Sequence, residues 1–152
     1  MVDVGAPLPN VTVKDDSGAD VHLQSLPRPL VLYFYPKADT PGCTNEGKQF
    51  RDLYQQFRGK GVEVIGVSRD SVAEQRAFRE KYDFPFRLLA DTESKICSAL
   101  GTLVERERDG QKSIGVARVT FLFGKDGKVA KVWPAVSVDG HGGDVLGACS
   151  LA

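Results

Sequence analysis

Residues 35–44 read Tyr-Pro-Lys-Ala-Asp-Thr-Pro-Gly-Cys-Thr, and they join two segments of different character. The apolar run at 31–35 predicts a buried strand, and apolar residues at helical spacing between 50 and 57 predict a helix. The Pro- and Gly-rich turn between them brings Cys43 into the first turn of that helix. Unpaired backbone N–H groups and the positive end of the helix dipole stabilise a thiolate there. We therefore predict that Cys43 is a reactive nucleophile.

The length and composition of the chain predict a single globular domain over residues 1–152. Of the 152 residues, 41% are hydrophobic, and 20 basic residues balance 20 acidic ones, so the formal net charge is zero. This balance argues against nucleic acid or an anionic membrane as a partner. No apolar run approaches the ~20 residues that span a bilayer. The start at 1–5 lacks the basic and apolar regions of a signal peptide, which predicts a cytoplasmic protein.

The three cysteines, Cys43, Cys97 and Cys149, are odd in number and far apart. Without a secretion signal, this pattern argues against a disulfide scaffold and favours catalytic or redox use of at least one thiol. Neither His22 nor His141 lies at metal-ligand spacing from a cysteine, so we expect no metal site. A Cys–His hydrolase stays open as an alternative, although His22 falls in a predicted hairpin and His141 follows a predicted loop.

The rest of the chain alternates predicted strands with predicted helices. Ser71 and Glu74 form a capping box at the start of one helix. The charged stretch at 102–113 is typical of a loop. In chain order we predict a hairpin at 11–13 and 21–23, strand 30–35, helix 43–58, strand 62–68, helix 71–82, strand 86–90, helix 93–100, a hairpin at 117–123 and 128–133, and a helix from 141. Strands joined through a helix pair in parallel, and the last hairpin adds antiparallel strands. We therefore predict an α/β fold with a mixed central sheet flanked by helices.

Three residues outside Cys43 can assist the thiol. Arg118 stands in the apolar run 117–123, where a charge is costly unless it lies at the strand end or has an anionic partner. It is therefore a candidate for the cation that a thiolate needs. The hydroxyl of Thr40 can exchange hydrogen bonds with a substrate and with the sulfur, and Pro36 stiffens the turn. The plainer alternatives are a small buried hydrophobe for Cys43 and a surface or salt-bridged arginine for Arg118.

The segment at 34–44, with the residues that follow at 46–52, resembles the peroxiredoxins. Within that family it is most similar to the bacterioferritin-comigratory-protein or Q-type branch. Similar segments at 66–71, 86–91, 118–121 and 140–141 extend the resemblance over nearly the whole chain. The resemblance implies a thioredoxin-like fold with an N-terminal β-hairpin extension.

The resemblance also implies a role for each candidate residue. Cys43 would be the peroxidatic cysteine, which attacks a peroxide oxygen and becomes a sulfenic acid. Thr40 would hydrogen-bond the peroxide, and Arg118 would hold the thiolate and polarise the peroxide. Pro36 would shield the sulfenic acid, and the backbone N–H of Cys43 would contact the substrate. Glu46 would orient the site, although an acid in the first turn of a helix is favourable by itself.

The implied activity is that of a thiol-dependent peroxidase, which reduces hydrogen peroxide and organic hydroperoxides without haem, flavin or metal. The reductant would be thioredoxin, glutaredoxin or a small thiol, and the protein would be a monomer. Three aromatic residues can line a pocket for organic hydroperoxides: Tyr35, Phe84 and Trp133. The alternative is that they simply pack in the core. The second class of function is a binding or holdase module on the same fold with an incidental thiol.

The chain departs from the Q-type branch in its resolving cysteine. Many members carry that cysteine five residues after the peroxidatic one, where this chain has Lys48, and others carry it on the next helix, where this chain has Arg79. Three routes remain: an external thiol reduces Cys43 directly, Cys97 resolves after local unfolding, or Cys149 resolves from the chain terminus. We favour the one-cysteine cycle with an external thiol.

The other two thiols and Lys48 each have a simpler explanation. Cys97 lies beside apolar residues, so packing is its simpler role, and incidental placement is the simpler explanation for Cys149. Lys48 can add positive potential near Cys43, or it can be an ordinary solvated lysine of the helix.

Overall fold

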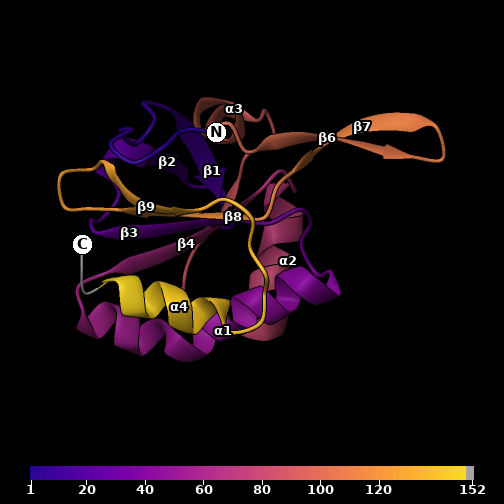
Figure 1. The fold of residues 1–152 in the computed structure, drawn as a ribbon. Coiled ribbons are helices and arrows are strands. Elements are labelled where there is room, and N and C mark those ends of the chain that lie inside the picture. The colour runs from indigo at the N-terminus through magenta and orange to yellow at the C-terminus, as the bar shows by residue number, and fades with distance from the viewer. Residues whose placement is uncertain (150–152) are drawn as a thin grey trace.

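A computed structural model describes residues 1–149 as a seven-stranded sheet with helices on both of its faces (Figure 1). The strands lie in the order β2-β1-β5-β4-β3-β8-β9. Their bounds are β1 (Thr12–Asp15), β2 (Asp20–His22), β3 (Leu30–Phe34), β4 (Glu63–Ser68), β5 (Leu88–Ala90), β8 (Val119–Phe123) and β9 (Val129–Trp133). The helices are α1 (Pro41–Gly59), α2 (Val72–Tyr82), α3 (Lys95–Leu100) and α4 (His141–Ala148), and a short 3-10 helix, η1 (Leu23–Ser25), follows β2.

The sheet is built around β3, whose five residues are all buried. This strand pairs in parallel with β4 and antiparallel with β8, and β4 pairs in parallel with β5. The hairpins β1–β2 and β8–β9 place antiparallel strands at the two edges. The predicted mixed sheet with flanking helices and an N-terminal hairpin is therefore confirmed.

Alternate side chains of β3 point to opposite faces of the sheet and divide the core in two. Leu30, Leu32 and Phe34 pack with the N-terminal segment, the first hairpin and α3. Val31 and Tyr33 pack with α1, α2 and α4. Figure 1 shows α1 and α4 side by side below the sheet, with α3 on its upper side. The start of α1, which carries Cys43, therefore belongs to the lower layer.

The helix boundaries follow from capping residues. Pro41 occupies the first position of α1, where its missing N–H costs no hydrogen bond, and Thr40 is the N-cap. The predicted capping box of α2 is confirmed: Ser71 Oγ accepts from the Glu74 N–H at 3.2 Å, and the Glu74 carboxylate accepts from the Ser71 N–H at 3.0 Å. These caps set both helices at the carboxyl edge of β3 and β4, where the candidate site lies.

The prediction of a loop at 102–113 is wrong. These residues belong mainly to a two-stranded hairpin of β6 (Leu103–Arg108) and β7 (Gln111–Val116), which projects from the body of the protein (Figure 1). Asp109 and Gly110 form its turn with φ values of 53° and 78°, the positive values that two-residue hairpin turns require. The charged residues beside this turn lack the apolar alternation that marks a strand, because the hairpin packs on little else.

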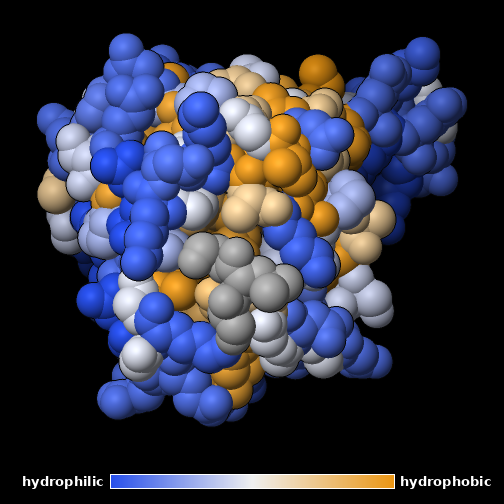
Figure 2. All heavy atoms as spheres, turned by 60° about the vertical axis from the view of Figure 1, so that its left-hand side comes forward, coloured by the Kyte–Doolittle hydropathy of each residue, from blue (hydrophilic) through white to orange (hydrophobic). Residues whose placement is uncertain are grey.

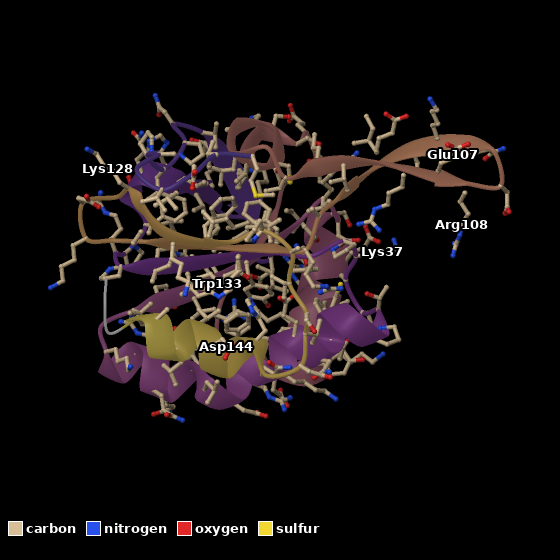
Figure 3. The ribbon with its side chains drawn as sticks, viewed as in Figure 1. Lys37, Glu107, Arg108, Lys128, Trp133 and Asp144 are labelled. Carbon is tan, nitrogen blue, oxygen red and sulfur yellow. The ribbon has the colours of Figure 1, made fainter. Side chains whose placement is uncertain are left out.

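The tip of this hairpin is hydrophilic. Figure 2 shows the projection as a strongly hydrophilic arm, and Figure 3 shows Glu107 and Arg108 at its end, away from the rest of the molecule. Glu105 and Lys112 form an ion pair of 3.5 Å across the two strands. The hairpin is therefore stabilised by its own backbone pairing and by cross-strand charges.

The tightest glycine contact of α1 gives a stability prediction. A Cβ at Gly47 would lie 2.5 Å from Cζ of Phe84, a buried ring that stacks on Phe86 and cannot easily move, whereas a Cβ at Gly59 would meet nothing within 4 Å. We predict that Gly47→Ala lowers the free energy of unfolding by about 1–3 kcal/mol through overpacking. The control Gly59→Ala should leave it equal or raise it by up to about 1 kcal/mol through helix propensity. Urea denaturation measures both, and equal stability of the two variants would contradict this packing.

Candidate active site

The loop between β3 and α1 is fixed at several points before it reaches Cys43. Tyr35 is buried, and its hydroxyl donates to Gln75 Oε1 at 2.6 Å. The Ala38 N–H donates to Asp70 Oδ2 at 2.8 Å, which ties the loop to the end of β4. Asp39 has a φ of 60° and accepts hydrogen bonds from two side chains of α2. The loop is thus anchored to α2 and to the segment that follows β4.

The two residues of α2 that hold Asp39 lie at the end of that helix. Lys81 Nζ donates to Asp39 Oδ2 at 2.8 Å, and the Tyr82 hydroxyl donates to Asp39 Oδ1 at 2.6 Å. Arg51, one helix away on α1, donates to the Tyr82 carbonyl at 3.0 Å. These contacts join α1, α2 and the loop at the place where Cys43 enters the helix.

Cys43 is only 1% exposed and lies in the first turn of α1. The first helical hydrogen bond runs from the Thr44 N–H to the Thr40 carbonyl at 2.8 Å, so the N–H groups of Gly42 and Cys43 precede the helical ladder. These two groups point outward from the positive end of the helix dipole, as predicted from the sequence. They are available to a ligand or a developing negative charge beside the sulfur.

Arg118 reaches the same point from a distant part of the chain. It directly precedes β8, which begins at Val119, so its charged group lies at a strand end rather than inside the apolar run. Its Nη2 donates to Cys43 Sγ at 3.4 Å. A Cβ on Gly42 would lie 3.1 Å from that Nη2, so the glycine makes room for the guanidinium. The structure therefore brings together the nucleophile and the cation that the sequence suggested.

The same guanidinium also holds Glu46. Arg118 Nη1 donates to Glu46 Oε1 at 2.8 Å, and the carboxyl side chain is completely buried. Burial raises the pKa of Glu46 to about 7, although the charge and hydrogen bond of Arg118 act in the opposite direction. Burial lowers the pKa of Arg118, but its pairing with Glu46 and Cys43 outweighs this and holds that pKa above its usual value. One cation thus faces two potential anions on α1.

The other two predicted residues lie in the loop and make no direct contact with the sulfur among the described interactions. Thr40 is half-buried, and its hydroxyl donates to the Lys37 carbonyl at 2.8 Å rather than capping the helix. Pro36 is half-buried directly after the Tyr35 anchor. That both form the rim of the Cys43 site, together with Gly42, stays a prediction.

Sequence reasoning missed one part of this site. His141, at the start of α4, places its Nε2 3.9 Å from Glu46 Oε2 and 2.8 Å from Thr120 Oγ1. Glu46, Thr120 and His141 come from three separate elements, and no spacing along the chain reveals that they meet. The signals in the sequence were a histidine at the start of a glycine-rich segment and the family resemblance at 140–141, and neither connects His141 to Glu46. Burial lowers the pKa of His141 to about 4, so it is neutral at pH 7.

The other two cysteines lie away from Cys43. Cys97 is buried among residues of the opposite face of the sheet, and burial raises the pKa of its thiol to about 12. Cys149 follows α4, which runs alongside α1, and Lys60 at the far end of α1 donates to the Leu146 carbonyl at 3.2 Å. From the helical rise, Cys149 is roughly 20 Å from Cys43. Burial raises the pKa of the Cys149 thiol to about 11, and the residue is 6% exposed.

The positions expected to hold a resolving cysteine have structural partners instead. Lys48 is exposed, with its Nζ 5.2 Å from the centre of the Tyr82 ring. Arg79 Nη1 donates to both carboxylate oxygens of Asp16, at 3.1 and 3.2 Å. Both side chains therefore hold α2 against neighbouring segments. The proposed effect of Lys48 on the potential at Cys43 stays a prediction.

The three aromatic residues suggested for a hydroperoxide pocket do not meet in one cavity. Tyr35 and Phe84 are buried, and each packs edge-on against Phe78 in the core. Trp133, the last residue of β9, has its ring centre 5.9 Å from that of His141, the first residue of α4. Ordinary packing, the alternative, describes Tyr35 and Phe84.

No cluster of metal-ligating side chains occurs within residues 1–149. Within the same residues, none of the helices has the length and apolar character needed to cross a membrane.

Comparison with known proteins identifies the family. The AhpC/TSA family matches residues 4–132. The bcp protein of Coxiella burnetii is 43% identical over 147 residues, which cover 96% of this chain and 97% of the relative. Peroxiredoxin Bcp of Bacillus subtilis is 38% identical over 146 residues, which cover 95% of this chain and 93% of the relative.

Solved structures agree with these relatives. The bacterioferritin comigratory protein of Xanthomonas campestris has a TM-score of 0.91 at 35% identity, with 98% of each chain covered. A peroxiredoxin Q variant of Xylella fastidiosa has a TM-score of 0.92 at 33% identity, with 99% of this chain and 97% of the other covered. The predicted thioredoxin-like fold is confirmed. The chain therefore belongs to the AhpC/TSA family, in its peroxiredoxin Bcp and Q branch, and is a thiol-dependent peroxidase.

Proposed function

We propose that Cys43 is the peroxidatic cysteine of this peroxidase and that Arg118, Thr40 and Pro36 complete its site. The observation that carries the proposal is the hydrogen bond of 3.4 Å from Arg118 Nη2 to Cys43 Sγ at the start of α1. A thiolate at this place is stabilised by a guanidinium and by the unpaired N–H groups of the first helical turn.

The chemistry follows from where charge develops. The thiolate attacks one peroxide oxygen, the O–O bond breaks, and Cys43 becomes a sulfenic acid while the other oxygen leaves as an alkoxide or hydroxide and takes up a proton. Arg118 and the backbone N–H of Cys43 are donors beside this point, so they stabilise the leaving oxygen as it gains negative charge. Thr40 Oγ1 donates to the Lys37 carbonyl and keeps its lone pairs for the peroxide O–H. Pro36, on the rim, shields the sulfenic acid from water.

The substrates are hydrogen peroxide and organic hydroperoxides. The related protein of Xanthomonas campestris has been described for its alkyl peroxide reduction activity. The similar fold and the presence of Cys43 in the same kind of site support the same substrate class for this chain. The reaction needs no haem, flavin or metal, because the sulfur itself accepts the oxygen.

The sulfenic acid is resolved by an external thiol in a one-cysteine cycle. One thiol attacks the sulfenic sulfur to form a mixed disulfide and water, and a second thiol releases Cys43 and forms the external disulfide. The other cysteines are poorly suited, since Cys97 packs on the opposite face of the sheet and Cys149 follows the far end of α4. The reductant is thioredoxin, glutaredoxin or a small thiol, and the protein acts as a cytoplasmic monomer without nucleic acid or membrane partners.

The one-cysteine cycle predicts the fate of Cys43 under peroxide. One equivalent of peroxide without thiol should leave a sulfenic acid on Cys43 that dimedone traps, and intact-mass analysis detects the adduct. Cys97→Ser and Cys149→Ser should trap as the wild type does. A quantitative disulfide from Cys43 to Cys97 or Cys149 would instead identify a resolving cysteine.

A peroxide-consumption assay separates the enzyme from a holdase with an incidental thiol. Peroxide consumption with thioredoxin as donor should disappear in Cys43→Ser, since no other thiol occupies the site. Equal consumption by the wild type and Cys43→Ser would exclude the proposed site.

Removal of the guanidinium tests the role of Arg118. Arg118→Met loses the donor to Sγ and the partner of Glu46, so the rate constant for reaction with peroxide should fall about 100-fold or more. Arg118→Lys keeps a charge but cannot make both hydrogen bonds, so its rate constant should lie between those of the wild type and Arg118→Met. Arg108→Met, at the exposed hairpin tip, is the matched control and should react at the wild-type rate. Stopped-flow peroxide kinetics measure all four proteins, and a normal rate for Arg118→Met would contradict the assignment.

A further inference from the structure

One oxygen of the buried carboxyl beside the site has no hydrogen-bond partner. Glu46 Oε1 accepts from Arg118, but Oε2 is buried without a hydrogen bond to any described residue. An ionised oxygen in that state is costly, because burial removes its water and nothing replaces it. The environment of Oε2 therefore favours a carboxyl group that carries a proton there.

One described polar group to which that proton can turn is the imidazole of His141. Its Nε2 is 3.9 Å from Glu46 Oε2, so a movement of about 1 Å brings the two atoms to hydrogen-bond distance. The same Nε2 lies 2.8 Å from Thr120 Oγ1, so its single lone pair is directed at that hydroxyl in the described structure and passes to Glu46 only when the Thr120 O–H turns away. The ring is 3% exposed and packs edge-on against Phe50 and Trp133, which holds it in place.

The start of α4 is docked so that this position is maintained. The Gly142 N–H donates to Gln49 Oε1 at 2.8 Å, and Gln49 Nε2 donates to the Val138 carbonyl at 2.7 Å. A Cβ at Gly142 would lie 2.9 Å from the Gln49 Cβ, so α4 approaches α1 as closely as a glycine permits. The imidazole is thus presented to Glu46 by a specific contact between two helices.

The charges around Glu46 show why its protonation matters. Arg118 from the start of β8 is the cation, and Cys43 from α1 supplies one potential anion. Tyr33 from β3 and His141 from α4 are neighbouring titratable groups, and Asp144 of α4 adds a negative charge that acts on His141. Burial raises the pKa of Tyr33 well above its usual value, so it is neutral, and His141 is neutral at pH 7. Two anions opposite one cation in a buried site are unfavourable, so the second acid keeps its proton.

We propose that His141 is a positioning residue whose Nε2 exchanges the hydroxyl of Thr120 for the hydrogen bond of a protonated Glu46, so that Arg118 is left to the thiolate of Cys43. This proposal rests on the proposed roles of Cys43 and Arg118. The burial of both residues supports the direction, because it raises the pKa of Glu46 to about 7 and lowers that of His141 to about 4. Between these values the proton belongs to the carboxyl, and the imidazole keeps its lone pair.

Infrared spectroscopy of the reduced, full-length protein tests the first half of the proposal. In the wild type, the C=O stretch of a protonated buried carboxyl should be present at about pH 6 and should disappear as the pH rises, with a midpoint near pH 7. The same band should be absent in Glu46→Gln. The pH profile of Cys43 alkylation by iodoacetamide should contain a step at the same midpoint, and Glu46→Gln should remove it, because the amide cannot ionise beside Arg118.

Substitution of His141 tests the second half. His141→Leu removes the acceptor, so the infrared midpoint should move down by about one pH unit and alkylation of Cys43 at about pH 6.5 should slow about three- to fivefold. His141→Gln keeps an acceptor, so its infrared midpoint and its alkylation rate should both lie close to those of the wild type. In the Glu46→Gln background, His141→Leu should have no further effect on the alkylation rate, whereas a purely structural role would slow both backgrounds equally.

Two results would overturn the proposal: an ionised Glu46 at about pH 6 in the wild type, or an equal effect of His141→Leu with and without Glu46. Should His141→Leu fail to fold, His141→Phe replaces it in both backgrounds, because it keeps a ring between Phe50 and Trp133 but has no acceptor. Failure of the proposed function is separate, because peroxide consumption by Cys43→Ser would refute the role of Cys43 while the infrared band of Glu46 stays measurable.

Discussion

The site depends on one guanidinium that two side chains of α1 share. Cys43 and Glu46 are three residues apart and therefore lie on the same face of the helix, where Arg118 bonds both, at 3.4 and 2.8 Å. The sheet register makes this possible. Phe34, the last residue of β3, pairs with Val119, the first residue of β8, so the residue before β8 lies beside the loop that leads into α1. A shift of that pairing by one residue would turn Arg118 to the other face of the sheet and leave a buried carboxyl without its cation.

Burial gives this shared contact its chemical effect. An ion pair at the surface is weak because water screens it, but Glu46 is completely buried and Cys43 is 1% exposed. In such surroundings the number of negative charges that one arginine can balance is limited, and the carboxyl and the thiol compete for it. The C-terminal helix is therefore part of the active site: α4 closes the space beside Glu46 and sets which polar atoms the carboxyl can reach.

The sequence predicted the parts of the site that local pattern encodes. Apolar runs and turn residues placed Cys43 at a strand-to-helix junction, and a charge beside an apolar strand singled out Arg118. The partnership of Glu46 with His141 could not be predicted, because it depends on how closely α4 docks on α1. The hairpin of β6 and β7 was missed for the opposite reason: its Asp109-Gly110 turn was visible, but strands that project into solvent carry no apolar period. Cys149 could be exposed because it lies near the chain end, but the structure buries it against the core, which the local sequence does not indicate.

The positions of Lys48 and Arg79 connect the fold to the reaction cycle. Lys48 lies over the Tyr82 ring and Arg79 bonds Asp16, so both residues fasten α2 to its surroundings. Tyr82 in turn bonds Asp39 of the active-site loop. A resolving cysteine at either position would have to move with its helix to reach Cys43. The lysine and the arginine found here instead hold α2 in place. In the proposed one-cysteine cycle, neither residue has to leave these contacts, because the thiol that reduces Cys43 comes from another molecule.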